Sequence, residues 1–275
     1  MSADDNTIPK RPVVQQSSCS LTKDNTPWSH HKKLISTDYF ELLLPQMKKF
    51  CQSYYTMVYG KKHLTKRISC IFAKPIKNDI NDNSKQTDNN NNQDLLQEDK
   101  YYKGNIPMYS ITSSDTPKEL GEIWDLLEEK FDLTFDYVLV HIYRDHQDYI
   151  GWHNDKEALN SSVVSVSLGA TRKFRFRPIN ETKGHTDELT MESGDVIHMH
   201  GPDPESENDV LRKGCQQTYK HYVPPMSVSD MKDHLIKQGV LLPSSGRLTK
   251  DILVKLMEKY DAFPVRINLT FRKHE

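Results

Sequence analysis

The stretch Arg266-Ile267-Asn268-Leu269-Thr270-Phe271-Arg272, near the C-terminus, decides both the fold and the chemistry that we predict for this chain. Polar and apolar residues alternate through it, as they do in a β-strand with one apolar face. On such a strand Arg266, Asn268 and Arg272 share a face. Arginine can hold a carboxylate with two parallel hydrogen bonds, so this face predicts a site for a dicarboxylate.

A set of three residues that precede this strand in the chain indicates a metal site. His153 and Asp155 are two residues apart, so on an extended strand both side chains point to one face and can bind one ion. A distant His221, on a facing strand, completes the two histidines and one carboxylate that hold non-haem Fe(II) with open coordination positions. A lone His-x-Asp pair has little specificity, and only its combination with the arginine strand favours a metal site. We interpret His198 and His200 as structural residues.

Length and composition bound the possible classes of protein. The 275 residues suffice for one β-rich domain, and the 36% hydrophobic content with a mean hydropathy of -0.73 indicates a core diluted by polar insertions. The chain has no apolar stretch of about 20 residues and no signal-peptide pattern at its start, so we expect a soluble intracellular protein without a membrane span. Its four cysteines lack a CxxC spacing and are expected to be reduced thiols.

The net charge of -1 excludes a globally basic nucleic-acid binder, so any such binding must be local. Two basic clusters are candidates, and a solvated surface is the alternative for each. They are Lys61, Lys62, Lys66 and Arg67, and Arg172, Lys173, Arg175 and Arg177.

The order of sequence patterns predicts one decorated domain. Residues 1–35 are expected to be a disordered tail, followed by a domain over 36–275 with insertions at about 76–104 and 226–262. Apolar periodicity predicts helices over 39–57, after Thr116-Pro117, and over 231–239 and 250–260. Period-two patterns predict strands over 137–143, 162–168, 173–177, 187–191, 195–199 and 267–271. The predicted fold class is therefore α+β: a double-stranded β-helix, or jelly roll, with N-terminal helices.

The combined motifs resemble the AlkB family of Fe(II)/2-oxoglutarate dealkylating dioxygenases. The resemblance covers roughly residues 38–75, 105–225 and 264–273. Its motifs are His153-x-Asp155, Ser167-Leu168-Gly169-Ala170, Gly194-Asp195, His221 and the 266–272 strand. Tyr143-Arg144-Asp145 and Phe174-Arg175-Phe176-Arg177 are similar to the eukaryotic branch that repairs duplex DNA.

This resemblance implies oxidative demethylation of N-alkylated bases, such as 1-methyladenine and 3-methylcytosine in DNA. Fe(II), 2-oxoglutarate and O2 would be used, and succinate, CO2 and formaldehyde released. The catalytic iron ligands would be His153, Asp155 and His221. The 2-oxoglutarate-binding residues would be Tyr143, Arg266, Asn268 and Arg272. A monomeric nuclear enzyme is expected.

The resemblance also implies substrate contacts and a nucleotide-recognition lid. Tyr59 would be an aromatic wedge in the base stack, with Lys61, Lys62 and Arg67 on backbone phosphates. Tyr109 would line the base pocket, and Glu157 would accept a hydrogen bond from an exocyclic amino group, unless it is only a surface glutamate. His141 departs from the family, which usually has asparagine there, so the affinity for 2-oxoglutarate or its pH dependence is expected to differ.

Other functions stay open on sequence alone. One keeps the iron chemistry but acts on RNA or on a protein side chain. Another is a non-catalytic nucleic-acid-binding module, which would have no need of an arginine clamp for a dicarboxylate.

Overall fold

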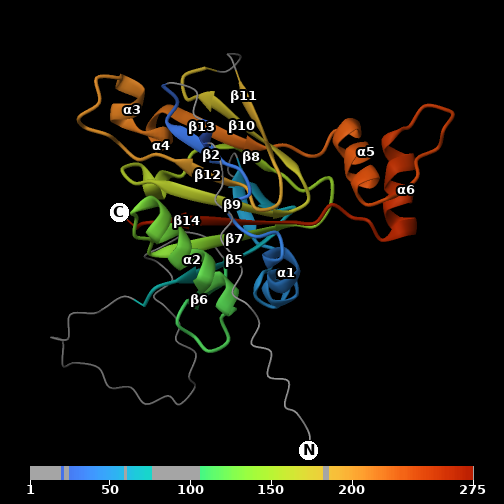
Figure 1. The fold of residues 1–275 in the computed structure, drawn as a ribbon, viewed down its shortest axis with the longest axis horizontal. Coiled ribbons are helices and arrows are strands. Elements are labelled where there is room, and N and C mark those ends of the chain that lie inside the picture. The colour runs from blue at the N-terminus through green and yellow to red at the C-terminus, as the bar shows by residue number, and fades with distance from the viewer. Residues whose placement is uncertain (1–19, 22–24, 59–60, 76–105, 182–185, 275) are drawn as a thin grey trace, which may run out of the picture.

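The computed structural model describes residues 20–21, 25–58, 61–75, 106–181 and 186–274, and its fold is drawn in Figure 1. Two β-sheets form the body. The major sheet has the strand order β1-β2-β12-β9-β14-β7-β5-β6, and the minor sheet the order β11-β10-β13-β8. Among the described strands, only β5 and β6 pair in parallel. The mixed α+β class with a large antiparallel sheet is as predicted.

The major sheet consists of β1 (Ser20–Leu21), β2 (Trp28–His31), β5 (Ile68–Ala73), β6 (Met108–Ser110), β7 (Tyr137–Tyr143), β9 (Val163–Gly169), β12 (Val196–Met199) and β14 (Arg266–Arg272). The minor sheet consists of β8 (Ile150–His153), β10 (Arg172–Pro178), β11 (Asp187–Met191) and β13 (Tyr219–Val223). A separate hairpin is formed by β3 (Tyr55–Val58) and β4 (Lys61–Leu64). The helices are α1 (Tyr39–Phe50), α2 (Lys118–Phe131), the 3-10 turn η1 (Lys156–Ala158), α3 (Asp209–Lys213), α4 (Cys215–Thr218), α5 (Val228–Lys237) and α6 (Lys250–Tyr260).

The strand β14 lies inside the major sheet, between β9 and β7, and is buried along its whole length. Its apolar residues Ile267, Leu269 and Phe271 join the core beneath α1 and α2. Its polar residues therefore face the other way, toward the minor sheet, because side chains alternate between the two faces of a strand. This alternation places Arg266, Asn268 and Arg272 in the space between the sheets.

Separate cores hold these layers together. The helices α1 and α2 cover the outer face of the major sheet, and Leu43, Met47 and Trp124 are among the fully or almost fully buried residues there. A second core fills the space between the sheets, where the rings of Trp28 and Phe176 stack at 4.0 Å. Aromatic stacking of this kind adds to the stabilisation by burial itself.

The helices α5 and α6 form a module of their own over residues 226–262, which projects to one side of the sheets (Figure 1). It has a separate apolar core, which includes Met231, Leu235, Leu253 and Met257. A capping box between Ser227 and Asp230 fixes the start of α5. The module connects β13 to β14, and it contains both of the helices predicted in this segment.

Several sequence-based boundaries need correction. The tail predicted over residues 1–35 includes β2, whose Trp28 is buried and which pairs with β12; residues 1–19 lie outside the described residues. The helix predicted over 39–57 ends at Phe50, and Tyr55–Val58 form a strand instead. The predicted insertion at 76–104 lies outside the described residues. Within the described part of the chain, none of the helices is long and apolar enough for a bilayer span.

Candidate metal and 2-oxoglutarate site

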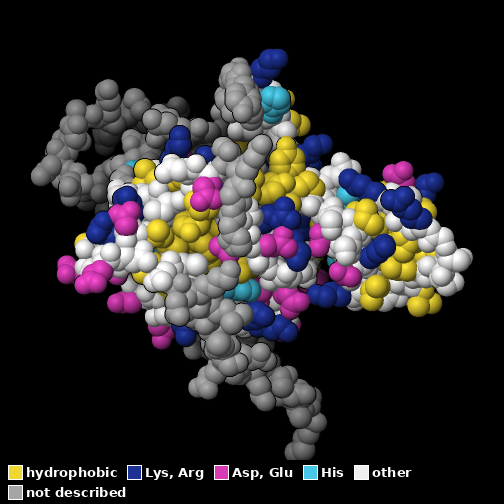
Figure 2. Space-filling view, turned by 90° about the horizontal axis from the view of Figure 1, so that it is seen from above, with side chains coloured by type: hydrophobic (Ala, Val, Ile, Leu, Met, Phe, Trp, Pro, Cys, Tyr) yellow, Lys and Arg dark blue, Asp and Glu magenta, His cyan; other side chains and the backbone are white. Residues whose placement is uncertain are grey.

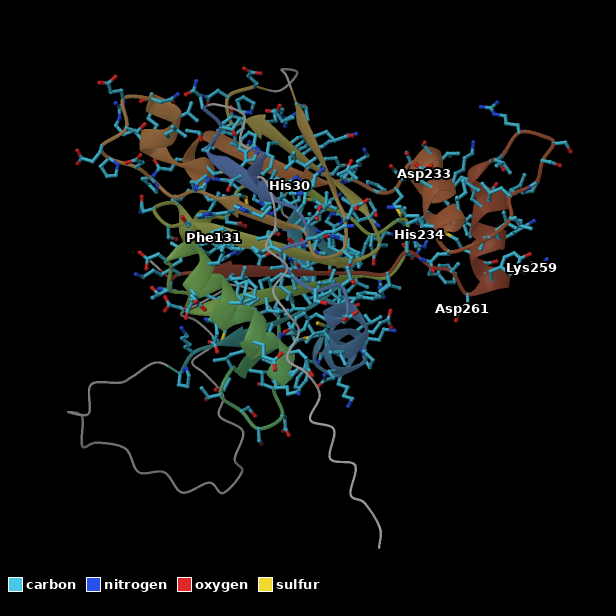
Figure 3. All side chains as sticks on the ribbon, viewed as in Figure 1. His30, Phe131, Asp233, His234, Lys259 and Asp261 are labelled. Atoms are coloured by element: carbon cyan, nitrogen blue, oxygen red, sulfur yellow. The ribbon has the colours of Figure 1, made fainter. Side chains whose placement is uncertain are left out.

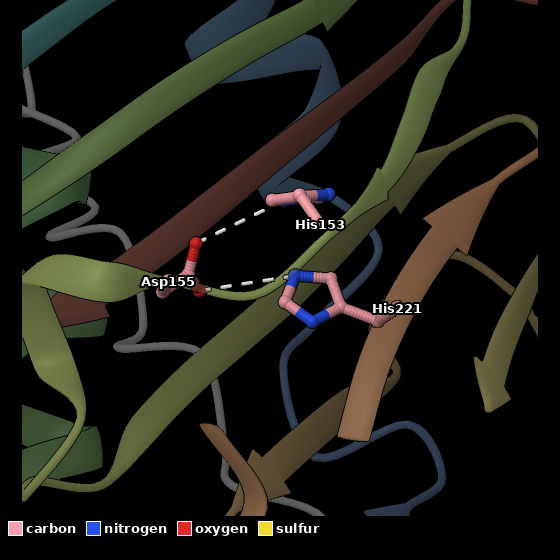
Figure 4. A group of neighbouring side chains, drawn as sticks. All are labelled: His153, Asp155 and His221. Carbon is pink, nitrogen blue, oxygen red and sulfur yellow. Dashed lines mark ion pairs between the residues drawn. The ribbon is translucent and has the colours of Figure 1, made fainter. Parts of the chain in front are cut away.

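His153, Asp155 and His221 converge between the two sheets (Figure 4). His153 is the last residue of β8 and lies opposite His221 of β13 in the strand register. Asp155 follows in the turn before η1, with an extended backbone. The Nε2 atoms of both histidines lie 3.8 Å from a carboxylate oxygen of Asp155. One potential ligand atom from each of the three residues lies within 4.8 Å of the others, close enough to share an ion.

Asp155 is held from two sides. Gln216 accepts a 2.8 Å hydrogen bond from its backbone N–H, and Arg272 donates one of 2.6 Å to Oδ1. Burial raises the pKa of the carboxyl group, but the charge of Arg272 and the two imidazoles outweigh burial and lower it. Asp155 is therefore ionised at neutral pH. Its Oδ2 is buried without a hydrogen-bond partner and can bind a cation.

Both histidines are prepared as neutral ligands. Nδ1 of His153 lies 2.8 Å from the carbonyl oxygen of Gly151, which can only accept, so Nε2 is the unprotonated nitrogen. Burial, followed by the charge of His153, lowers the pKa of His221 to about 3. The ring of Phe174 stacks on His221 at 5.5 Å and fixes its plane. A neutral imidazole offers a lone pair to a metal, so this donor set suits Fe(II).

Arg266 supplies a buried cation nearby. Its Nε donates to Ser167 at 2.8 Å and its Nη2 to Asn268 at 2.6 Å, while Nη1 is buried with no hydrogen-bond partner. The guanidinium lies 5.0 Å from the ring centre of Tyr143. Burial lowers its pKa to about 10, so it stays protonated at neutral pH. A fixed cation with one free donor is suited to a carboxylate of 2-oxoglutarate.

A pocket between the sheets brings most of these groups together; Asp155 and Arg266 are not among its lining residues but are hydrogen-bonded to Arg272 and Asn268, which are. Its lining consists of His141, Tyr143, Ile150, His153, Ser165, Phe174, Met199, His221, Val223, Asn268, Thr270 and Arg272. His141 accepts or donates a 2.6 Å hydrogen bond with Ser69, and burial lowers its pKa well below the usual range. The residues predicted for iron and for 2-oxoglutarate thus lie together at one place, and the orphaned atoms of Asp155 and Arg266 fit these two groups.

The predicted substrate residues are more scattered. Glu157 is exposed beside the site, with Oε2 3.9 Å from Nη1 of Arg272. Lys61 is exposed on β4. Arg67 donates to the carbonyl of Tyr149 at 3.1 Å and to the hydroxyl of Tyr54 at 2.7 Å, so these protein groups already engage its guanidinium. The predicted wedge Tyr59 lies outside the described residues.

The prediction that Tyr109 lines the base pocket is wrong. Tyr109 lies opposite Phe72 in the pairing of β6 with β5, and the two share the helix-covered face of the major sheet. Its ring packs against Phe50 at 4.9 Å and its hydroxyl donates to the Phe50 carbonyl at 3.3 Å. His198 lies on the same outer face, against Phe131, and is not part of the metal cluster.

Sequence reasoning missed residues that support the site. Arg172, assigned to a basic cluster, is buried; it donates to the carbonyls of Asp145 at 3.0 Å and Pro224 at 3.1 Å, and also to that of Asp148. It thereby ties the β7–β8 loop to the start of the α5–α6 module. Gln216, on the short helix α4, gave no sequence signal. Its role depends on a contact across 61 residues of chain.

Comparisons with known proteins agree with this geometry. A family model described as "2OG-Fe(II) oxygenase superfamily" matches residues 69–272. The mouse protein named "Alpha-ketoglutarate-dependent dioxygenase alkB homolog 3" is 29% identical over 177 residues, which are 62% of this chain and 49% of the mouse protein. The bovine protein named "DNA oxidative demethylase ALKBH2" is 38% identical over 78 residues, which are 25% of this chain and 28% of the bovine protein.

Among solved structures, the one described as "The structure of OsALKBH1" is 19% identical, with a TM-score of 0.45. The match covers 92% of this chain and 99% of that chain. This chain spans about half the length of the mouse and rat homolog 3 proteins that it matches.

Proposed function

Because this chain belongs to the 2OG-Fe(II) oxygenase superfamily, we propose that it removes methyl groups from nitrogen atoms of nucleic-acid bases. The family makes it an enzyme that uses Fe(II), 2-oxoglutarate and O2, and the relatives named as AlkB homologs confirm the AlkB resemblance. Proteins named homolog 3 and ALKBH2 both match, so its place in the duplex-DNA branch is part of the proposal. The single observation that carries it is the convergence of the triad with the arginine strand β14, where Arg272 is hydrogen-bonded to Asp155 and Arg266 is buried with Nη1 unpaired.

We assign Fe(II) to His153, Asp155 and His221. When bound together, Fe(II), 2-oxoglutarate and O2 supply the oxidation that releases an N-methyl group as formaldehyde, with succinate and CO2 as co-products. Arg272 keeps Asp155 ionised and oriented through its 2.6 Å hydrogen bond. Each neutral imidazole has one lone pair for the metal, which in His153 is on Nε2.

We assign 2-oxoglutarate to Tyr143, Arg266, Asn268 and Arg272. The free Nη1 of Arg266 would donate to the carboxylate far from the metal, while Ser167 and Asn268 fix the guanidinium plane. A guanidinium held this rigidly binds a carboxylate with little loss of side-chain entropy. Arg272 approaches from the metal side, next to Asp155.

For the substrate, we propose N-methylated adenine and cytosine in DNA, such as 1-methyladenine and 3-methylcytosine. Glu157 supports this choice, because its exposed carboxylate lies beside the metal site and could accept a hydrogen bond from the exocyclic amino group of these bases. Lys61 and Lys62 are exposed on the hairpin and suit backbone phosphates. We further propose a nuclear location, where the DNA substrate would be found, and a fluorescent fusion would test it.

The decisive experiment measures succinate and formaldehyde released from methylated oligonucleotides. The variants His153→Ala and Asp155→Ala should lose turnover by several orders of magnitude, while Asp125→Ala, which changes an exposed carboxylate on α2, should keep the wild-type rate. Circular dichroism should report the same fold for all three. Wild-type formaldehyde release by either triad variant would refute the assignment.

The substrate class needs a second set of assays. Methylated single- and double-stranded DNA and RNA of one sequence, compared by kcat/KM, would separate DNA repair from RNA demethylation. Glu157→Gln should lower kcat/KM for methylated cytosine at least tenfold with little change in KM for 2-oxoglutarate, since the proposed partner of Glu157 is the base and its 3.9 Å approach to Arg272 is longer than a hydrogen bond. An enzyme that forms succinate with none of these nucleic acids would point to a protein substrate.

A further inference from the structure

The α5–α6 module carries a pocket that the proposed chemistry does not use. It has a volume of about 570 Å³ and is lined by Val228, Lys232, Gly246, Arg247, Leu248, Thr249 and Lys250. Three of these residues are cations and none is an acid. No salt bridge links Lys232, Arg247 or Lys250 to a carboxylate among the described residues. We call these three side chains the cation pocket.

A neighbouring pocket shows that this composition is not a general property of the module. The pocket between α5 and the minor sheet, of about 470 Å³, includes Glu192, Asp230 and Asp233 among its lining. Its Lys237 is paired with Glu192 at 3.1 Å. The lysine and arginine residues in that lining equal the acidic residues in number, whereas the lining of the cation pocket has three such cations and no acid. In Figure 2, Lys and Arg side chains are prominent on the module, next to exposed apolar ones.

The module is anchored at the proposed active site. It leaves β13 just after Val223 and returns at the start of β14, and both strands contribute to the pocket between the sheets. Met226 donates a 2.9 Å backbone hydrogen bond to the carbonyl of His146 in the β7–β8 loop. Arg172 ties the same loop to Pro224. These contacts hold the module in a fixed position beside the site.

The β7–β8 loop also connects the module to the basic segment that contains Lys66 and Arg67. Arg67 donates to the carbonyl of Tyr149 at one side of this loop, and Arg144 donates to the carbonyl of Lys66. At the other side, His146 has a pKa lowered by burial and, next, by the charge of Lys250. Basic residues from β4–β5 and from α6 thus flank one short loop, which itself joins the strands of Tyr143 and His153.

We propose that the cation pocket binds phosphate groups of the nucleic-acid backbone and extends the substrate surface from the active-site entrance onto the α5–α6 module. This inference rests on the proposed function. Backbone phosphates are spaced regularly and carry one negative charge each, so a second cation group beside the entrance can bind the same strand without reading its sequence. It should strengthen binding to long substrates.

The test compares two variants of the full-length protein with equal charge change. Arg247→Gln with Lys250→Gln removes two cations of the pocket, and Lys255→Gln with Lys259→Gln removes two exposed cations of α6 outside it; Lys259 points away from the sheets (Figure 3). Binding of a fluorescent DNA duplex is measured by anisotropy over a range of salt concentrations. All four side chains are at least partly exposed, so both variants should fold.

The pocket variant should bind duplex on the order of tenfold more weakly and show a slope of log K against log salt that is shallower by up to about 1.8, close to 0.9 for each phosphate that the variant no longer neutralises. The α6 control should behave as wild type. Equal slopes for the two variants would overturn the inference. So would unchanged DNA binding by the pocket variant together with loss of binding to anionic phospholipid vesicles.

This binding experiment requires no turnover, so it is read independently of the proposed function. If the wild-type protein releases no succinate with any methylated nucleic acid, the proposed function fails. If it is active but the two variants bind duplex alike, only the role of the cation pocket fails.

Discussion

Arg272 and Asp155 form a buried ion pair, with Nη2 2.6 Å from Oδ1, although 117 residues separate them in sequence. The last strand of the fold thus neutralises the carboxylate of the candidate metal site. Without this partner, a buried carboxylate would be strongly destabilising, or would bind a proton and lose its value as a ligand. The pair therefore connects the stability of the sheet to the chemistry of the site.

Arg272→Gln should lower the free energy of unfolding by about 3–5 kcal/mol, the usual cost of removing one partner from a buried ion pair. The measurement is urea denaturation in the presence of a chelator. Lys273→Gln, which changes the exposed neighbouring residue, should have little effect. Adding Zn²⁺ in place of the chelator should reduce the loss of unfolding free energy in Arg272→Gln, because the ion supplies positive charge to Asp155. Equal urea midpoints for Arg272→Gln and Lys273→Gln in the presence of the chelator would contradict the pairing.

Arg266→Lys should raise KM for 2-oxoglutarate at least tenfold, with a smaller change in kcat. A lysine retains the charge but cannot bond Ser167 and Asn268 and still offer a rigid donor to the carboxylate. Steady-state kinetics with varied 2-oxoglutarate measure the effect. Arg175→Lys is the matched control, because Arg175 lies half-exposed on the minor sheet and pairs with Glu188. An unchanged KM would remove Arg266 from the co-substrate site.

The alternating strand patterns made much of the fold predictable. The strands at 187–191 and 266–272 were placed from sequence to within one residue, because each has a clear period of two. The strand β2 was missed because it lies in a polar segment and is stabilised by pairing with β12, more than 160 residues later in the chain. The helix at 39–57 was predicted too long because the apolar periodicity continues past Phe50, where α1 ends; Tyr55–Val58 form β3.

The site was predictable where a residue's role follows from its type and strand parity. Arg266 and Asn268 share a strand face, and their type suits a dicarboxylate. Tyr109 was misplaced because strand parity across the preceding insertion could not be counted from sequence alone. The supporting contacts of Arg172 and Gln216 are set by tertiary packing, which leaves no local pattern in the chain.

His141→Asn should leave the pH dependence of KM for 2-oxoglutarate unchanged between pH 6 and 8. Burial is the largest reason that the pKa of His141 lies well below its usual range, so the imidazole is neutral throughout this window and loses no charge as pH rises. The variant can keep a hydrogen bond to Ser69 through its amide. The measurement is KM at several pH values, and a wild-type transition near pH 6.5 that the variant lacks would contradict a neutral His141.

His198 should make the protein less stable as pH falls from about 6.5 toward 3. Burial, followed by the charges of His200 and His31, lowers its folded pKa to about 3, whereas an unfolded histidine has a pKa of about 6.5. Between these values the unfolded chain binds the proton and the folded chain does not, so unfolding becomes easier as pH falls. Between pH 7.5 and pH 5 this linkage amounts to about 1–2 kcal/mol.

His198→Leu should remove that part of the loss of unfolding free energy, measured by urea denaturation at both pH values. Ile197→Val, a packing change on the same strand, should shift stability equally at both; a His198→Leu profile parallel to wild type would show that His198 is protonated in the folded protein.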